Sequence, residues 1–267
     1  MPIRISLKTV AVLAGLGGAG LSGFAPGAIS GGWLAPAAHA ATTPTIDAAA
    51  SAAVSQMAKT LLASQAFSFQ VHTLRTYAGP DGQPLHIGHT AKITVRRPDR
   101  LLIAINGDDG VVNLVYDGKT MAVSRVNAKE YSVIPVPGTI QGMMEMVMGR
   151  LKVDFPLADF LTDAPDKSFL FGVTEGKDVG TAMIDGVPCS HLFFKQPPDI
   201  ELELWVEKEK PDQALPKRLF VTYRSLPDQP SFIAVFSDWN LNAQPTDAEF
   251  VFTPPEGAKK VEPKPAQ

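Results

Sequence analysis

The side chains best suited to acid–base or metal chemistry are scattered along this sequence. Four of its five histidines are His72, His86, His89 and His191, and each lies in a segment with strand-like alternation. His86 and His89 are three positions apart, so in a strand they point to opposite faces and make poor co-ligands for a metal ion. The histidines therefore predict neither a metal site nor a local catalytic motif.

The carboxylates favour solvated surfaces over catalysis. Asp108 and Asp109 are adjacent in a turn, but the spaced oxygen ligands of a calcium loop are missing around them. Glu201, Glu203 and Glu207 share a strand in which the intervening residues are mostly apolar. This pattern is typical of a strand with one wet face, and a general acid–base pair is the weaker interpretation.

The remaining reactive groups do not indicate an enzyme. Cys189 is the single cysteine, so no internal disulfide can form and a buried structural thiol is expected. Residues 15–20 match GxGxxG, but no strand and helix flank them, so we reject a dinucleotide site. After residue 40 there is no GxSxG, HExxH, GxxxxGK[ST] or CxxC. We expect no catalytic residues, no metal and no cofactor.

Residues 1–40 have the features of a cleavable export signal. Arg4 and Lys8 give a basic start, an uncharged apolar run follows over 9–21, and Ala38-His39-Ala40 forms a small-x-small cleavage site. No cysteine lies near that site for lipidation, and no later apolar run reaches the roughly 18–20 residues of a membrane span. We expect a soluble periplasmic protein that begins near residue 41 and has no transmembrane anchor.

The charge balance argues against nucleic acid as a partner. Without the two basic residues of 1–40, the chain carries 22 Lys and Arg against 27 Asp and Glu. A nucleic-acid-binding protein needs a basic face, which this acidic balance does not favour.

A methionine-rich helix is predicted within residues 138–162. Its apolar residues recur at the spacing of one helix face: Ile140, Met143, Met144, Val147, Met148 and Leu151. Four of the eight methionines lie in this segment. Methionine is flexible and polarisable, so the helix suits either an irregular core or a surface that accepts ligands of variable shape.

The segments around this helix read as strands. A helix over 46–62, with Asp47 placed to cap it, precedes about eleven strands in two blocks, and the methionine-rich helix separates the blocks. A second helical turn is expected at 155–161, with Pro156 at its first position, and strands resume at 170. The pattern predicts a mainly β (α+β) protein, built as a single domain over 41–253 with a strongly curved antiparallel sheet. We expect residues 254–267 to form a Pro-rich, irregular tail.

Several longer motifs carry a resemblance. They are RRPDRL (96–101), YDGKT (116–120), PVPGTI (135–140), DFPLADFL (154–161), DGVPCSHL (185–192) and SDW (237–239). With them, nearly all of the chain after residue 40 resembles a family of predicted bacterial periplasmic proteins of unknown function. More loosely, the order of elements is similar to the LolA/LolB/LppX lipoprotein-localisation fold.

This resemblance implies a half-barrel with an apolar cavity, covered by helices and occupied by a lipid or acyl chain. The implied lid and cavity residues are Phe67, Phe69, Ile140, Met143, Met144, Val147, Met148 and Leu151. It further implies that Arg97, directly before Pro98, closes the lid through hydrogen bonds to helix backbone. Asp99-Arg100 departs from the carrier pattern and could hold Arg97 in an ion pair instead.

Three functions stay open at this point, of which the least favoured is an enzyme that acts on lipid or envelope polymer and needs a polar cluster inside the cavity. The first is a monomeric carrier or binding protein for a hydrophobic ligand, which could also contact an inner- or outer-membrane envelope protein. The second is an interaction module, because a related sheet serves as the sensor in envelope-stress regulators, where the partner is a membrane-bound regulatory protein.

Overall fold

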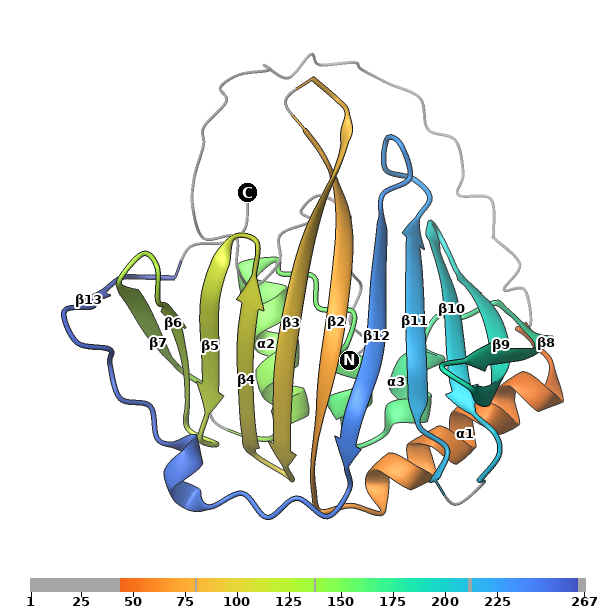
Figure 1. Cartoon of the computed structure of the whole chain (residues 1–267), viewed down its shortest axis with the longest axis horizontal. Helices are drawn as coiled ribbons and strands as arrows, with labels where there is room; N and C mark the ends of the chain where they lie inside the picture. Colours follow the sequence, from red (N-terminus) through yellow and green to blue (C-terminus); the bar gives the residue numbers. More distant parts are fainter. Residues whose placement is uncertain (1–43, 80, 137, 211–212, 264–267) are drawn as a thin grey trace, which may run out of the picture.

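The structure, a computed structural model, describes residues 44–79, 81–136, 138–210 and 213–263. The predicted export signal, residues 1–40, lies outside these ranges. The described residues form one thirteen-stranded sheet, three α-helices and short 3₁₀ helices (Figure 1). The predicted mainly β fold is confirmed.

The elements have the following bounds. The strands are β1 Thr45–Ile46, β2 Ala66–Ala78, β3 Pro84–Arg96, β4 Arg100–Gly107, β5 Gly110–Tyr116, β6 Thr120–Arg125, β7 Glu130–Pro135, β8 Glu175–Ile184, β9 Val187–Gln196, β10 Ile200–Glu207, β11 Pro216–Tyr223, β12 Ser231–Asn240 and β13 Lys259–Lys260. The helices are α1 Ala48–Leu62, α2 Ile140–Leu151, α3 Pro165–Phe169, and the 3₁₀ helices η1 Ala158–Leu161 and η3 Asp247–Phe250.

The sheet joins the two predicted blocks of strands at its centre. Its order is β1-β8-β9-β10-β11-β12-β2-β3-β4-β5-β6-β7-β13, so the last long strand, β12, pairs with the first, β2. Neighbouring strands are antiparallel except at the two edges, where β1 pairs with β8 and β13 pairs with β7 in parallel. The middle of the sheet is therefore a continuous antiparallel surface.

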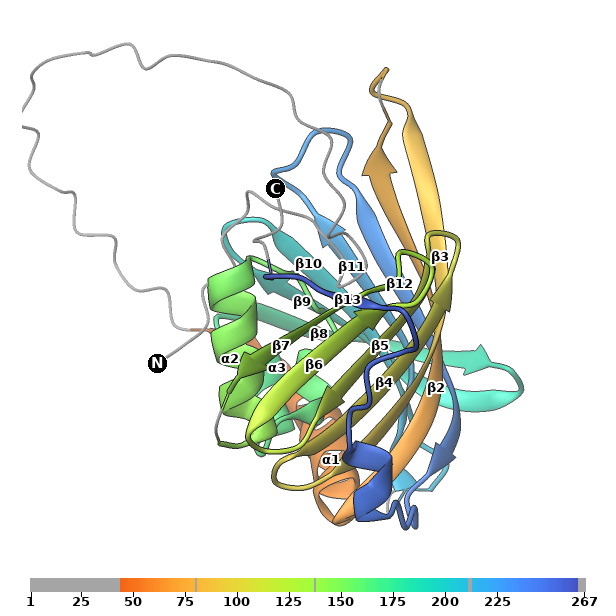
Figure 2. The same ribbon diagram turned by 90° about the vertical axis from the view of Figure 1, so that its left-hand side faces the viewer.

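The sheet curves, and all three α-helices lie on its concave side (Figure 2). Successive side chains of a strand point to opposite faces of the sheet, so apolar residues two positions apart share one face. On β2, Phe67, Phe69 and Val71 point to the concave side and are buried, whereas His72 is exposed. The concave face is thus the one that carries most of the apolar core.

Several sequence predictions need correction. There are thirteen strands, not eleven, because β1 and β13 are two-residue strands too short for alternation to reveal. β13 lies inside the segment that was expected to be an irregular tail. The strand expected from residue 170 begins only at Glu175, because the chain turns after α3, which ends at Phe169, and Gly172 adopts a φ of 74° in that turn.

Asp47 occupies the N-cap position of α1, as predicted, but its side chain makes no cap hydrogen bond. Its Oδ2 instead accepts a hydrogen bond from the Asp178 backbone N–H at 3.2 Å. Likewise, Pro156 does not begin a helix, since the helical turn in this region is η1, which starts at Ala158.

Candidate functional site

A helical insert, residues 138–173, connects β7 to β8 across the concave face. Its start is fixed to the β3–β4 and β5 regions, since Ile140 N–H donates to the Pro98 carbonyl at 2.8 Å and Tyr116 Oη–H donates to the Gly138 carbonyl at 2.7 Å. The Thr139 side chain caps α2 by accepting from Gly142 N–H at 3.2 Å. α2 ends where Lys152 adopts a left-handed conformation with φ of 57°.

The predicted lid residues pack into the core. Five of them are buried against the sheet: Ile140, Met143, Met144, Val147 and Leu151. Met148 is partly buried at the edge of the same cluster. Phe67 and Phe69 are buried too, and the Phe69 ring stacks on Trp239 with centroids 4.3 Å apart. The structure therefore brings all eight residues into one apolar cluster between sheet and helices.

Arg97 joins the sheet to the middle of the insert. Its Nη1 donates to the backbone carbonyls of Leu161 at 3.2 Å and Thr162 at 2.8 Å. Its Nη1 also lies 3.6 Å from Asp163 Oδ1, whereas Asp99 pairs with Arg100 at 2.8 Å. The contact with insert backbone that the resemblance implies is present in this geometry.

The Arg97 guanidinium is buried without a full set of hydrogen-bond partners. Burial lowers its pKa, and the nearby Asp163 only partly offsets this effect. Nε and Nη2 are buried with no hydrogen-bond partner among the described residues. A buried donor without an acceptor costs about 1–3 kcal/mol. The two hydrogen bonds to the insert are therefore made by a guanidinium group that still has two buried donors without acceptors.

A small cavity of about 50 Å³ remains between the insert and the sheet. It is lined by side chains from β2, β3, β4, β12 and the part of the insert between α2 and η1: Val71, Thr73, Arg75, His89, Ala91, Ile93, Ile103, Ile105, Asp154, Phe155, Pro156, Leu157 and Phe232. None of the eight predicted lid and cavity residues lines it. The lining is mainly aliphatic, with charged groups at Arg75 and Asp154.

Those charged groups form a buried cluster that spans sheet and insert. Arg75 Nη1 donates to Asp154 Oδ2 at 2.9 Å, and their side chains are 4% and 7% exposed. Tyr223 Oη–H donates to the same carboxylate oxygen. The Arg75 guanidinium also lies 4.9 Å from the centroid of Phe232, its cross-strand neighbour.

The cluster keeps fixed charges inside the fold. Burial opposes the charged form of Arg75, but Tyr223 and Asp154 outweigh it and raise its pKa above the ordinary value. Burial and the Asp154 carboxylate raise the pKa of Tyr223, so its hydroxyl keeps its proton as a donor. The site therefore holds one cation, one anion and a neutral phenol.

The sequence reasoning missed Arg75, Asp154, Tyr223 and Phe232. One signal was available, because the alternation that places Phe67, Phe69 and Val71 on one face of β2 continues to position 75. An arginine on an apolar face is uncommon and indicates a buried partner. Nothing in the spacing of residue 154 identifies that partner, since it lies on the insert.

The other chemical groups have structural partners. Buried His89 bonds through Nε2 to Asp109 Oδ1 at 2.9 Å, and His86 is exposed on the opposite face, as predicted. Cys189 is buried, which raises its thiol pKa. His191 Nε2 lies 2.7 Å from Glu203 Oε2. Across the described ranges, no group of three or more His, Cys, Asp or Glu residues is placed to hold a metal ion.

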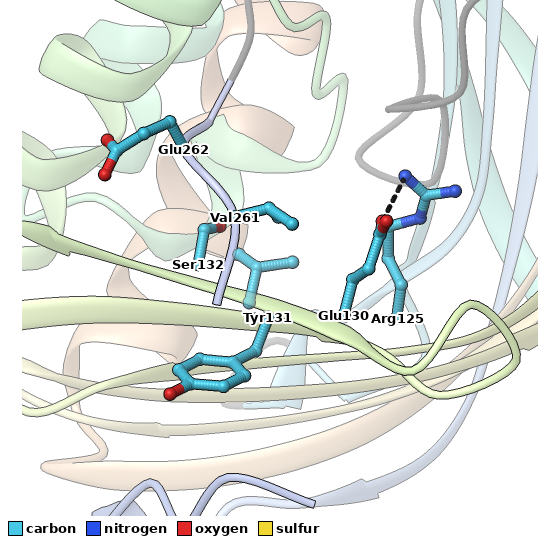
Figure 3. A pocket seen from close by; sticks show the side chains of 7 residues that line it. Arg125, Glu130, Tyr131, Ser132, Val261 and Glu262 are labelled. Atoms are coloured by element: carbon cyan, nitrogen blue, oxygen red, sulfur yellow. Dashed lines mark ion pairs between the residues drawn. The ribbon is translucent and has the colours of Figure 1, made fainter. Parts of the chain in front are cut away.

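A second cavity, of about 120 Å³, lies at the β6–β7–β13 edge (Figure 3). Arg125 and Glu130, which form an ion pair at 3.4 Å, stand on one side of the strands, and Tyr131 points to the other. Val261 and Glu262 close it from the segment after β13. Its charged lining does not suit an apolar ligand.

Comparison with solved structures gives matches that cover most of the chain. Lipoprotein LppX of Mycobacterium tuberculosis is 17% identical, with a TM-score of 0.46 over 74% of this chain and 98% of that one. A LolA superfamily protein of Nitrosomonas europaea is 12% identical, with a TM-score of 0.35 over 76% and 97%. The MucA/MucB complex of Pseudomonas aeruginosa contains a chain that is 13% identical, with a TM-score of 0.40 over 77% and 62%.

In the part of the chain that the structure describes, no helix combines the length and apolar character needed to cross a membrane.

Two further comparisons concern sequence. Among curated proteins, no sequence matches this chain. The profile of a family described as predicted periplasmic protein (DUF2092) matches residues 50–263. This match covers most of the chain and confirms the resemblance seen in its motifs, and the chain belongs to the DUF2092 family of predicted periplasmic proteins.

Proposed function

We propose that this chain binds a hydrophobic ligand, an acyl chain of a lipid or lipoprotein, between the concave face of the sheet and the helical insert. The observation that carries the proposal is the aliphatic cavity at this boundary, on a face whose cover is attached through buried polar contacts. In this proposal the chain is an exported binding or carrier protein, residues 1–40 are its cleaved signal, and it catalyses no reaction.

The volume of the cavity requires the insert to move. Small-molecule sites usually enclose about 300–1,000 Å³, whereas this cavity measures about 50 Å³. The structure is therefore the closed form in our proposal, and a ligand displaces part of the insert. The surface that such displacement uncovers is the inner face of α2 and the facing strands, which includes the eight residues predicted from the sequence.

The energetics permit this exchange. Burying an acyl chain contributes about 0.8 kcal/mol per CH₂ group, so a chain of about twelve carbons gains up to about 10 kcal/mol. Opening removes the apolar contacts of the insert and the hydrogen bonds of Arg97 to the Leu161 and Thr162 carbonyls. Water satisfies those groups in the open form, so each bond loses only about 1.5–3 kcal/mol net.

The test is to isolate the protein from its native periplasm, extract it with solvent and identify lipids by mass spectrometry. Titration of the delipidated protein with a fluorescent fatty acid then measures binding directly. Co-purified lipid together with saturable binding is expected. Absence of both, with a stable protein partner recovered instead, would contradict the proposal and favour the sensor module.

A matched pair of variants ties binding to the insert. Met148 is partly buried on α2, so Met148→Asp places a charge beside the proposed ligand and should abolish fatty-acid binding while the fold survives. Val251, which is 66% exposed, provides the control Val251→Asp. Equal binding by both variants would mean that α2 does not cover the ligand.

A further inference from the structure

Arg75 is a charged side chain on a mainly apolar stretch of the concave face. It shares its face of β2 with Phe67, Phe69, Val71 and Thr73, and only 4% of its side chain is exposed. Taking a charge out of water costs several kcal/mol, and an apolar side chain of similar size is often as stable at such a position. Packing alone therefore gives no reason for a cation here.

The partners of Arg75 belong to two different parts of the fold. Tyr223 ends β11 and stays with the sheet, whereas Asp154 lies on the insert, just after α2. The Arg75 guanidinium and the Tyr223 hydroxyl both donate to Oδ2 of Asp154, which is the single carboxylate of the cluster. Movement of the insert would remove this anion and leave the guanidinium and the phenol hydroxyl on the sheet.

The guanidinium also keeps unused donor capacity. Its Nε is buried and has no hydrogen-bond partner among the described residues, and its Nη1 reaches Asp154 through one oxygen only. Guanidinium groups bind carboxylates and phosphates best through two parallel N–H bonds. The Arg75–Asp154 pair does not use this arrangement, so the carboxylate or phosphate of a ligand has room to accept more N–H bonds from Arg75 than Asp154 does.

The surroundings of Arg75 are those of an amphiphile site. Arg75 lines the same cavity as Val71, Ile93, Ile103 and Ile105, which are apolar. A ligand with its anionic group at Arg75 would lay its hydrocarbon part along these side chains. An anion without a hydrocarbon part would leave them uncovered.

We propose that Arg75 binds the anionic head group, a carboxylate or a phosphate, of an acyl-chain ligand, and that the Asp154 carboxylate occupies the place of that head group in the closed form. Tyr223 donates its hydroxyl hydrogen to the ligand anion as it does to Asp154. The inference rests on the proposed function and names its ligand class. It makes insert displacement and anion binding one exchange, in which Arg75 keeps a partner throughout.

The test compares three ligands of equal chain length by calorimetric titration of the full chain after signal removal: dodecanoate, dodecyl phosphate and dodecanol. The wild type should bind the better anionic ligand about 10–100-fold more tightly than dodecanol, as expected for hydrogen bonds to a charged group. The tighter of the two anions identifies the head group as carboxylate or phosphate.

Variants isolate the role of Arg75. Arg75→Met alone leaves the Asp154 carboxylate buried without its cation, so it could fail to fold. The double variant Arg75→Met/Asp154→Leu replaces the pair by apolar groups and should keep the fold while the anion-to-dodecanol ratio falls to about one. Asp154→Asn, which removes the competing anion, should raise the ratio. Arg96→Met removes an arginine whose partner, Asp247, is exposed, and should leave it unchanged.

The outcomes separate the two proposals. Binding of dodecanol and both anions with equal affinity, in the wild type and in the double variant, would overturn the anion site and leave hydrophobic-ligand binding intact. Failure of all three ligands to bind would overturn the proposed function and this inference together.

Discussion

Helix α1 and the helical insert both cover the concave face, but different forces attach them. The inner face of α1 consists of Ala50, Val54, Met57 and Leu61, all fully buried, and its start is tied to β8 by the bond from Asp47 N–H to the Gly176 carbonyl. The insert also buries apolar residues, yet its contacts with the sheet include Arg97 and Asp154, two charged side chains.

The difference concerns what each cover leaves behind when it moves. Removing α1 would expose mainly apolar surface, which water does not stabilise. Removing the insert returns Arg97, Arg75 and Asp154 to water, which solvates charges well and offsets part of the lost contact. We infer that α1 is a permanent part of the core and that the insert is the releasable cover.

The largest expected effect comes from α1. Leu61→Ala removes fully buried packing and should lower the free energy of unfolding by about 2–5 kcal/mol in urea denaturation. Its neighbour Leu62 is 42% exposed, so Leu62→Ala should change stability by less than about 0.5 kcal/mol. If Leu61→Ala increased hydrogen exchange in α1 alone, α1 would also be a releasable cover.

The next effect should be confined to the insert. Arg97→Met removes the two bonds to the Leu161 and Thr162 carbonyls, but also two buried unpartnered donors. We expect the free energy that holds the insert on the sheet to fall by about 1–3 kcal/mol, which corresponds to about 10–100-fold faster amide exchange in α2 and α3. Exchange in α1 should not change.

The control for this variant is the adjacent residue. Arg96 pairs with Asp247, whose side chain is 87% exposed, so Arg96→Met should alter exchange in the insert little. Equal acceleration in α1 and α2 on loss of Arg97 would show that the two covers open together.

A smaller effect should depend on pH. Burial raises the pKa of Asp159, in η1, from the ordinary 3.8 to about 7. The folded chain then holds a proton that the unfolded chain releases, so stability falls as the pH rises from about 4 to about 7 and is constant above this range. Asp159→Asn should remove this slope in thermal denaturation curves.

The size of the slope should be modest. Asp159 is only partly buried by surface exposure, so we expect an effect near about 1 kcal/mol, equivalent to about 2–4 °C in Tm. If the change in Tm between pH 5 and pH 8 were the same in the wild type and in Asp159→Asn, Asp159 would be solvated and would not report on the insert.

The smallest expected effect is none at all. Cys189 lies in a separate buried cluster with Ile184 and Trp205, away from both covers. Its thiol should react with a thiol reagent only on global unfolding, so Arg97→Met should leave the labelling rate unchanged and Leu61→Ala should increase it. Faster labelling in the Arg97 variant would mean that the stability of the whole sheet depends on the attachment of the insert.

Alternation in the sequence was sufficient to predict most of the sheet and its two blocks. Period-two patterns such as that of 66–77 correspond closely to β2, and the period of α2 was equally clear. Alternation does not say which face is concave, because that depends on the twist of the whole sheet. Hence Phe67 and Phe69 could be predicted as buried but not placed relative to the cavity.

The candidate site was harder to predict than the fold. Arg75, Asp154 and Tyr223 come from β2, the insert and β11, and pairings at such separations depend on how the insert crosses the sheet. Short segments were also missed, since Pro165–Phe169 and Lys259–Lys260 are too short to show a period. The Arg-Pro motif was the exception, because it drew attention to Arg97 directly.

The short strand β13 has a practical consequence for the boundary of the folded unit. Lys259 N–H and Val261 N–H donate to the Lys129 and Tyr131 carbonyls at 2.8 Å each, so this segment covers an edge of β7 that would otherwise be open. Uncovered strand edges recruit other chains and promote aggregation. A chain shortened at residue 253, the boundary suggested by its proline content, would lose this protection, whereas one that extends to 263 would keep it.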